Sequence, residues 1–245
     1  LFLTPLFRNL PEATLAAIVI VAVSGMFKLE KMKYLYRVRK LDFALAMVAL
    51  FGVLTFEETL AGLLVAVIVS LLALVLRTSQ PRFSILGYSP DGVEFGNMQQ
   101  HPDYISVPGL LILRPDEGIF FANASTLRDE IRALVSASEP PMKAVLLDLE
   151  ATNDLDVPGA EMLAELHEDL ELLEIRLLLA RVRTPVQVLL DRSGVTAVIG
   201  PQNIVPSLTS GVFAYHQQVE GDDGRVAFVS GWLHNLVEKN ISKSL

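Results

Sequence analysis

Residues 144–149, Ala-Val-Leu-Leu-Asp-Leu, decide the fold of the larger part of this chain. The run is apolar except for Asp148 and shows no alternation of apolar and polar side chains. Such a run is typical of a strand that is buried on both faces, as in the centre of a parallel sheet covered by helices. The stretch therefore predicts a layered domain of strands and helices around it.

The sequence on either side of this run supports an α/β domain. Shorter apolar runs at residues 109–113, 118–121 and 175–180 read as further strands, and they alternate with segments whose apolar residues recur at helical spacing. Ser125 or Thr126 is the expected N-cap of the helix before the central run. We predict a mixed β-sheet with helices packed against it over residues 106–220, followed by a C-terminal extension, 221–245, that has helical character.

Charge and hydropathy divide the chain near Pro81. Residues 1–80 carry eight Lys/Arg and five Asp/Glu, whereas residues 81–245 carry twelve and twenty-three. The mean hydropathy of the whole chain is +0.44, and the apolar excess lies in the first part. A net charge of −8 therefore describes neither part. We interpret residues 1–80 as membrane-embedded and residues 81–105 as a linker.

Three apolar segments in the first part, at about 12–27, 41–56 and 59–77, are the expected transmembrane helices. A full span requires roughly 20 residues, so only the third approaches that length. Short segments of this kind pack against other helices of a larger bundle. Because the chain opens on an apolar run at Leu1 without Met, we expect it to be part of a longer protein.

Basic residues predict the orientation of these segments. They crowd the connection between the first and second segments and follow the third, so both places are expected on the cytoplasmic side. The same reasoning puts residues 81–245 in the cytoplasm. The connection also carries apolar residues at near-helical spacing, as a helix lying at the surface of anionic lipid would. These basic residues are Lys28, Lys31, Lys33, Arg37, Arg39, Lys40, Arg77 and Arg82.

Several phrases of the sequence resemble one family in order along the chain. Residues 10–20, Leu-Pro-Glu-Ala-Thr-Leu-Ala-Ala-Ile-Val-Ile, and 39–43, Arg-Lys-Leu-Asp-Phe, are similar to the last membrane helices of the sulfate permease (SulP) family of anion transporters. Residues 107–115, 120–124 and 146–149 resemble the STAS domain that follows in those proteins. The resemblance covers most of the chain.

The resemblance implies a secondary active inorganic-anion transporter with a cytoplasmic STAS regulatory domain. Sulfate is the first expected substrate, with bicarbonate or a dicarboxylate as alternatives, and the protein is expected in the inner or plasma membrane as a homodimer. Residues 1–80 would belong to the gate domain of an inverted-repeat transporter. The substrate-binding residues are then expected upstream of Leu1, so none is assigned in this chain.

The loop after the central strand is the candidate interaction site of the STAS domain, and a cytoplasmic protein is the partner expected for it. In related anti-sigma-factor antagonists, a serine in this loop is phosphorylated. Here Val157 and Pro158 stand at the corresponding positions, and neither side chain can accept a phosphoryl group. A capping role for Asp156 with Pro158 at the start of the next helix is the alternative. The candidate residues are Asn153, Asp154, Asp156, Val157, Pro158 and Gly159.

Other function classes lack support in the sequence. The chain has no cysteine and no Gly-rich nucleotide loop, and its four histidines are too dispersed to suggest a metal site. We therefore expect no enzyme activity, cofactor, metal or nucleic-acid partner. The alternative function is a membrane-tethered STAS signalling module that binds a regulatory protein.

Overall fold

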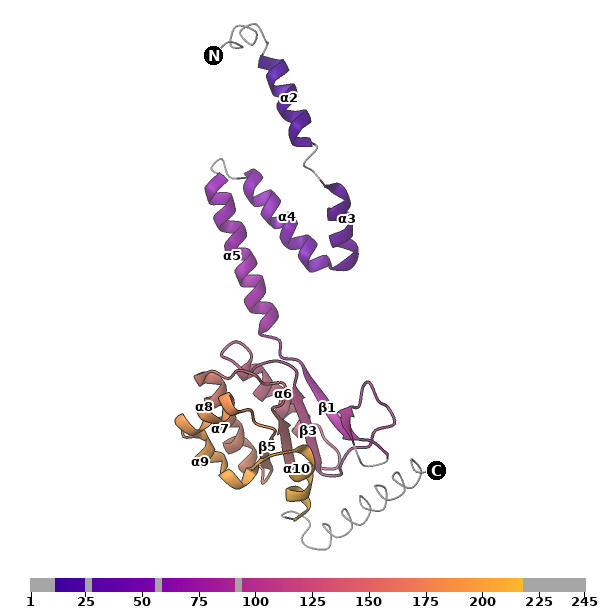
Figure 1. Cartoon of the computed structure of the whole chain (residues 1–245), viewed down its shortest axis with the longest axis vertical. Helices are drawn as coiled ribbons and strands as arrows, with labels where there is room; N and C mark the ends of the chain where they lie inside the picture. The colour runs from indigo at the N-terminus through magenta and orange to yellow at the C-terminus, as the bar shows by residue number, and fades with distance from the viewer. Residues whose placement is uncertain (1–11, 25–27, 56–58, 91–93, 218–245) are drawn as a thin grey trace. The chain divides into compact units, whose positions relative to one another are not determined.

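A computed structural model describes residues 12–24, 28–55, 59–90 and 94–217. The chain divides into two compact units, Leu1–Leu74 and Val75–Leu245. Figure 1 shows the elements of both units along the chain. The predicted extension at 221–245 lies outside the described residues.

The second unit is built on one six-stranded mixed sheet with the strand order β2-β1-β3-β4-β5-β6. Strands β3 to β6 run parallel, while β1 is antiparallel to β3 and β2 is antiparallel to β1. The strands are β1 (Phe83–Tyr88), β2 (Phe95–Asn97), β3 (Leu110–Pro115), β4 (Ala144–Asp148), β5 (Arg176–Ala180) and β6 (Ile204–Val205). The mixed sheet predicted from the sequence is confirmed.

Strand β4 lies at the centre of this sheet, between β3 and β5, and every residue in it is buried. Successive side chains of a strand point to opposite faces. Val145 and Leu147 accordingly join one apolar core, and Ala144 and Leu146 join another on the opposite face. The unbroken apolar run is thus explained by burial on both faces.

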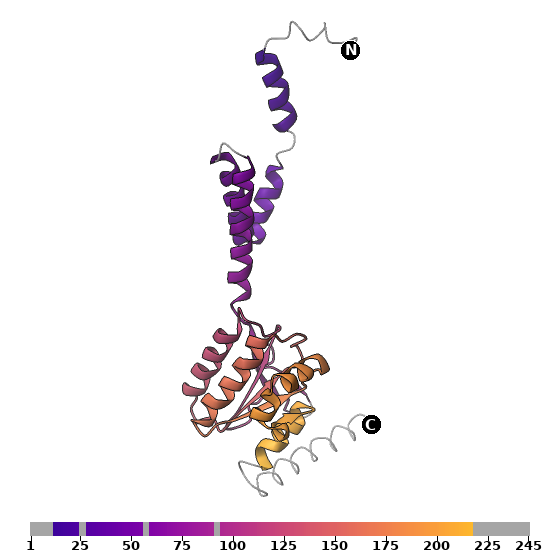
Figure 2. The same ribbon diagram turned by 90° about the vertical axis from the view of Figure 1, so that its left-hand side faces the viewer.

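Helices cover the two faces unequally. Four helices from the connections between parallel strands pack on one face, as expected where successive crossovers share one hand. Helix α10 (Leu208–Tyr215) packs on the other face, and Gly211 allows it to approach Leu146 closely. Figures 1 and 2 show this layered arrangement. The four helices are α6 (Ala124–Ser136), α7 (Val157–Glu171), α8 (Thr184–Arg192) and α9 (Val195–Ile199).

The predicted linker at residues 81–105 is wrong, because this stretch contains β1 and β2. Strand β1 pairs with the free edge of β3, and Leu86 is buried in the core on the α10 face. The domain therefore begins near Phe83 rather than at residue 106.

Two smaller expectations in this unit also fail. Residues 118–121 form no named strand, and only Ile119 makes a bridge, to Leu155. The helix expected to be capped by Ser125 or Thr126 begins earlier, at Ala124, with Asn123 at the cap position. The Asn123 side chain bonds the loop instead, accepting from the Phe120 amide and donating to the Gly118 carbonyl.

Four helices begin within the described residues of the first unit, and the last of them extends past Leu74 into the second unit. They are α2 (Glu12–Ser24), α3 (Leu29–Val38), α4 (Lys40–Thr55) and α5 (Thr59–Thr78). Among the described residues, one helix is long and apolar enough to cross a membrane, over Leu60–Thr78. Helix α3 contacts α4, and the Tyr36 and Phe43 rings meet edge to face at 5.2 Å between centroids. Among the described residues, the predicted helices thus form at the expected places, and α3 is the helix expected in the basic connection.

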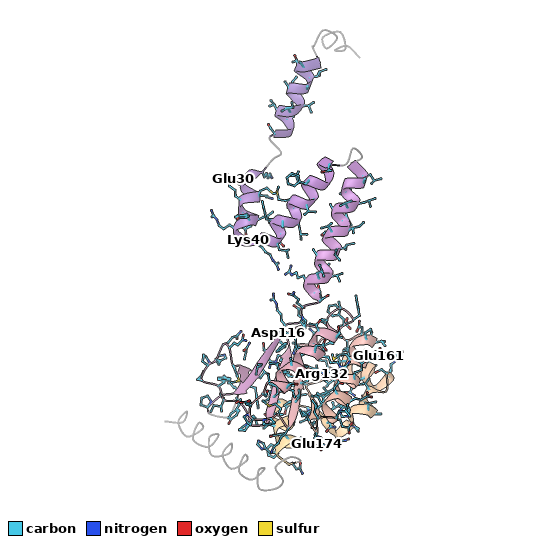
Figure 3. The ribbon with its side chains drawn as sticks, turned by 180° about the vertical axis from the view of Figure 1, so that it is seen from behind. Glu30, Lys40, Asp116, Arg132, Glu161 and Glu174 are labelled. Atoms are coloured by element: carbon cyan, nitrogen blue, oxygen red, sulfur yellow. The ribbon has the colours of Figure 1, made fainter. Side chains whose placement is uncertain are left out.

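An ion-pair network joins α6 to α7 across their outer surfaces. Arg128 of α6 donates from Nε to Asp169 Oδ2 at 2.6 Å and also contacts Glu165 of α7. This hydrogen bond from Arg128 lowers the pKa of the Asp169 carboxyl below its ordinary value of 3.8. Figure 3 shows the side chains of this unit, with Arg132 and Glu161 labelled on the same two helices.

We expect a fragment that begins at Ser79 to fold alone, because both cores draw their buried residues from positions 86–215. A fragment that begins at Ser106, the boundary suggested by the sequence, lacks β1 and β2 and leaves an edge of β3 unpaired. Far-UV circular dichroism and amide NMR dispersion should show a cooperative fold for the first fragment and aggregation or disorder for the second. Equal folding of both fragments would contradict this role of β1.

Replacement of Asp169 should change the pH dependence of stability. Because the folded pKa of Asp169 is lowered, its contribution is fully present above pH 3.8 and disappears as the pH falls through the folded value. We therefore expect Asp169→Asn to lower the free energy of unfolding at pH 7, with a difference from wild type that shrinks below pH 3.8. Urea unfolding of the Ser79 fragment across this range measures it, and a constant difference would refute the assignment.

Candidate functional site at the carboxyl edge of the sheet

The loops that follow β3, β4 and β5 meet at the carboxyl edge of the parallel strands, where open α/β sheets commonly bind ligands. They comprise residues 116–123, 149–156 and 181–183. The predicted interaction loop is the second of these. Its residues fall into a structural group and an exposed group.

Asp156 holds two of the loops together and begins α7. Its Oδ1 accepts a hydrogen bond from the Gly159 amide at 2.8 Å, which is a helix N-cap. Its Oδ2 accepts from the Phe121 amide in the loop after β3, also at 2.8 Å. The predicted capping role of Asp156 is therefore confirmed. Pro158 lies in the first turn, one residue later than the first helical position, which Val157 occupies.

Gly159 is required because the loops after β3 and β4 approach each other closely at this position. A Cβ atom at this position would lie 2.7 Å from the Ile119 carbonyl oxygen and 2.8 Å from a Leu155 methyl group. Ile119 and Leu155 form the single bridge between the two loops, so the backbone there has no room for a side chain. Gly159 is thus a packing residue of the loop pair.

The remaining predicted residues are at the surface. Asn153 and Asp154 are exposed, and the Asp154 carboxylate accepts only from the neighbouring Leu155 amide among the contacts described. Val157 is 53% exposed, and Phe121, brought beside it by the Asp156 bond, is 67% exposed. A shallow groove of about 230 Å³ continues from Phe121 between α6 and α7, with both polar and apolar side chains along it. Its lining residues are Phe121, Ala124, Ser125, Arg128, Asp129, Pro158, Glu161, Met162 and Glu165.

Phosphorylation of the loop has no acceptor at the expected place. Val157 and Pro158 stand at the exposed start of α7, and neither carries a hydroxyl group. The hydroxyl upstream in the loop belongs to Thr152, whose side chain is buried. A kinase could not reach Thr152 in this fold. The exposed start of α7 is therefore apolar, and it has no hydroxyl group to accept a phosphoryl group.

A second constellation at the same edge was not predicted. Asp148, at the end of β4, has no exposed surface and binds two arginines. Arg114 Nε donates to Asp148 Oδ2 at 2.6 Å, while Arg181 donates from Nε to Oδ1 at 2.8 Å and from a terminal nitrogen to Oδ2. Glu150 adds a carboxylate that contacts Arg181 at 2.6 Å and Arg114 at 3.7 Å. The signal for this cluster in the sequence was a lone carboxylate in an apolar strand.

The cluster lies on the α10 face of the sheet, opposite the groove between α6 and α7. Arg114 and Asp148 alternate with Leu113 and Leu147, so they point to the same side as Ile112 and Leu146. Arg181 follows β5 with a φ of 55°, which is unusual for a residue other than glycine. A fully buried carboxylate requires partners of this kind, because an unpaired buried charge is strongly destabilising.

Among the described residues, we assign none to the binding of a transported anion. The sequence of the membrane segments suggests none either, and the expectation that these residues lie upstream of Leu1 stays a prediction.

Replacement of Asp156, a structural residue of the loop, should lower stability more than replacement of the exposed Asp154. Asp156→Ala removes the N-cap and the bond to Phe121, so the free energy of unfolding of the Ser79 fragment should fall by about 1 to 2 kcal/mol. Asp154→Ala is the matched control, since that exposed carboxylate bonds only the adjacent amide, and it should change stability by less than about 0.5 kcal/mol. Urea unfolding measures both, and equal losses would contradict a structural role specific to Asp156.

Comparison with known proteins identifies both units. Residues 1–49 match the Sulfate permease family, and residues 101–211 match the STAS domain. Sulfate transporter 1.1 of Arabidopsis thaliana is 35% identical over 211 residues, covering 83% of this chain and 32% of the relative. High affinity sulfate transporter 1 of Stylosanthes hamata is 34% identical over 223 residues, covering 88% and 33%. The chain spans about a third of the length of these relatives.

Solved structures agree with the fold. The overall structure of the anion transporter SLC26A9 matches with a TM-score of 0.72 at 22% identity, covering 87% of this chain and 36% of that one. Murine Slc26a9 in the inward-facing state matches with a TM-score of 0.65 at 24% identity, covering 74% and 30%. The two family matches, in this order along one sequence, and the relatives that extend across both show that the chain belongs to the sulfate permease family and carries its STAS domain.

Proposed function

We propose that the protein is a secondary active transporter of inorganic anions, with sulfate as the first substrate to test. The observation that carries the proposal is the ordered pair of matches, a sulfate permease segment at residues 1–49 and a STAS domain at 101–211. Relatives named as sulfate transporters align across both parts. Bicarbonate and dicarboxylates are further candidates, and the substrate-binding residues would lie upstream of Leu1.

In this proposal, the STAS domain lies on the cytoplasmic side of the membrane. Helix α5 is long and apolar enough to span a bilayer, and Arg77 near its end and Arg82 just after it favour a cytoplasmic position for that end. Helix α3 supports the same orientation, because Lys31, Lys33 and Arg37 lie on an amphipathic helix that suits an anionic lipid surface.

The STAS domain would regulate transport through protein contacts. The exposed apolar residues Phe121 and Val157, near the groove between α6 and α7, support a role in protein contacts. A homodimer is part of the proposal, and so is the absence of enzyme activity. The alternative, a signalling module switched by serine phosphorylation, is disfavoured by the missing hydroxyl groups at Val157 and Pro158.

Uptake of radiolabelled anions into proteoliposomes tests the proposal directly. The full-length protein, including the sequence upstream of Leu1, should accumulate sulfate with saturable kinetics, and unlabelled sulfate should compete. Bicarbonate and dicarboxylate uptake would be measured in parallel, with protein-free liposomes as the control.

Failure to transport any of these anions would defeat the transporter proposal. In that case, recovery of a stoichiometric cytoplasmic protein complex with the STAS domain would favour the signalling module instead.

A further inference from the structure

We propose that Arg114 and Arg181 form a binding site for a tetrahedral divalent oxyanion, and that Glu150 occupies this site when no anion is bound. The site does not include the candidate interaction residues 153–159, although Glu150 precedes them in the same loop, and it lies on the α10 face of the carboxyl edge. The inference begins with how Asp148 positions the two guanidinium groups.

Asp148 fixes both arginines without using all of their donors. Arg114 bonds Asp148 through Nε, and Arg181 bonds it through Nε and one terminal nitrogen. Each guanidinium has five N–H donors in a planar fork, so terminal N–H groups of both remain for another acceptor. Asp148 is fully buried, whereas the two arginine side chains are each 26% exposed. The arginines are therefore anchored from inside and reach solvent outside.

Glu150 shows where a bound anion would sit. One of its carboxylate oxygens, Oε2, lies 2.6 Å from Arg181 Nη1 and 3.7 Å from Arg114 Nη2, so donors from two different strands converge on one acceptor. Convergent N–H groups of this kind match the oxygens of carboxylate, sulfate and phosphate. The chain's own carboxylate thus marks the place of the ligand.

Displacement of Glu150 by a stronger ligand costs little. Its side chain is 50% exposed, and in the described part of the chain its carboxylate contacts only these two arginines. Exposed ion pairs are weak, because water screens the charges and holding two long side chains in one geometry costs entropy. An oxyanion with two charges and four oxygens can contact both forks at once, whereas the Glu150 carboxylate carries one charge. Without Glu150 the remaining side chains of the cluster have a net charge of +1, which favours an anion.

The position of the cluster also favours ligand binding. Open α/β sheets commonly bind ligands beyond the carboxyl ends of their parallel strands. Arg114, Asp148 and Arg181 lie at the ends of β3, β4 and β5. The choice of sulfate as the first ligand rests on the proposed function, since the site would then sense the transported anion in the cytoplasm. Binding itself does not depend on transport.

The test uses the 245-residue chain in detergent micelles with ¹⁵N-labelled arginine. Sulfate and phosphate are titrated at constant ionic strength, with chloride as the reference salt, and the Nε–H signals of Arg114 and Arg181 are followed by NMR. We expect saturable shifts of these two signals with the divalent oxyanions. Glu150→Gln removes the competing charge and should tighten binding by roughly threefold to tenfold.

Two variants make the outcome specific. Glu165→Gln is the matched control, because it removes one exposed carboxylate from an arginine in the Arg128 network, and it should leave the affinity unchanged. Arg114→Lys keeps the positive charge but loses the fork, so binding should weaken. The proposal is overturned if the shifts do not saturate, if chloride reproduces them, or if Glu165→Gln tightens binding as much as Glu150→Gln. Binding without sulfate uptake would defeat only the proposed transport function.

Discussion

Burial of β4 on both faces is the constraint on which the rest of this domain depends. A strand with apolar side chains on both sides needs a cover on each, and α6 to α9 provide one while α10 provides the other. Parallel neighbours on both sides follow from the crossover helices. The single charge in the strand, Asp148, is tolerated because two arginines from the adjacent strand ends neutralise it in place.

The carboxyl edge of the sheet carries two different kinds of surface. On the face of α6 and α7, Asp156 uses both oxygens for structure and thereby brings exposed apolar side chains, Phe121 and Val157, next to each other. On the α10 face, charged side chains converge around Asp148. One surface suits a protein contact and the other suits a small anion.

The loop before α7 combines a helix cap with an exposed helix start that has no hydroxyl group at Val157 or Pro158. Asp156 caps the helix and Gly159 permits the close loop pair, so the backbone of the loop is retained for packing reasons. Val157 occupies the exposed start of the helix without a hydroxyl group. Contact with a partner, rather than covalent modification at this point, is the chemistry that these side chains support.

The sequence by itself determined the elements that depend on local pattern. Apolar periodicity located β4, β5, α7 and α8, the basic connection beside apolar segments predicted the membrane unit, and Asp156 with Pro158 predicted the start of α7. These succeed because helix spacing, capping and continuous burial are properties of neighbouring residues.

Only the tertiary structure decided the features that join distant residues. Strands β1 and β2 are short and lie among turn residues, and pairing with β3 is what makes them strands. The Asp148 cluster unites Arg114, Glu150 and Arg181, and the two arginines lie 67 positions apart in the chain. Nothing in local spacing encodes such a meeting, because it follows from the order of parallel strands in the sheet. The proposed anion site is therefore a product of topology, while the strand beneath it was visible in the sequence.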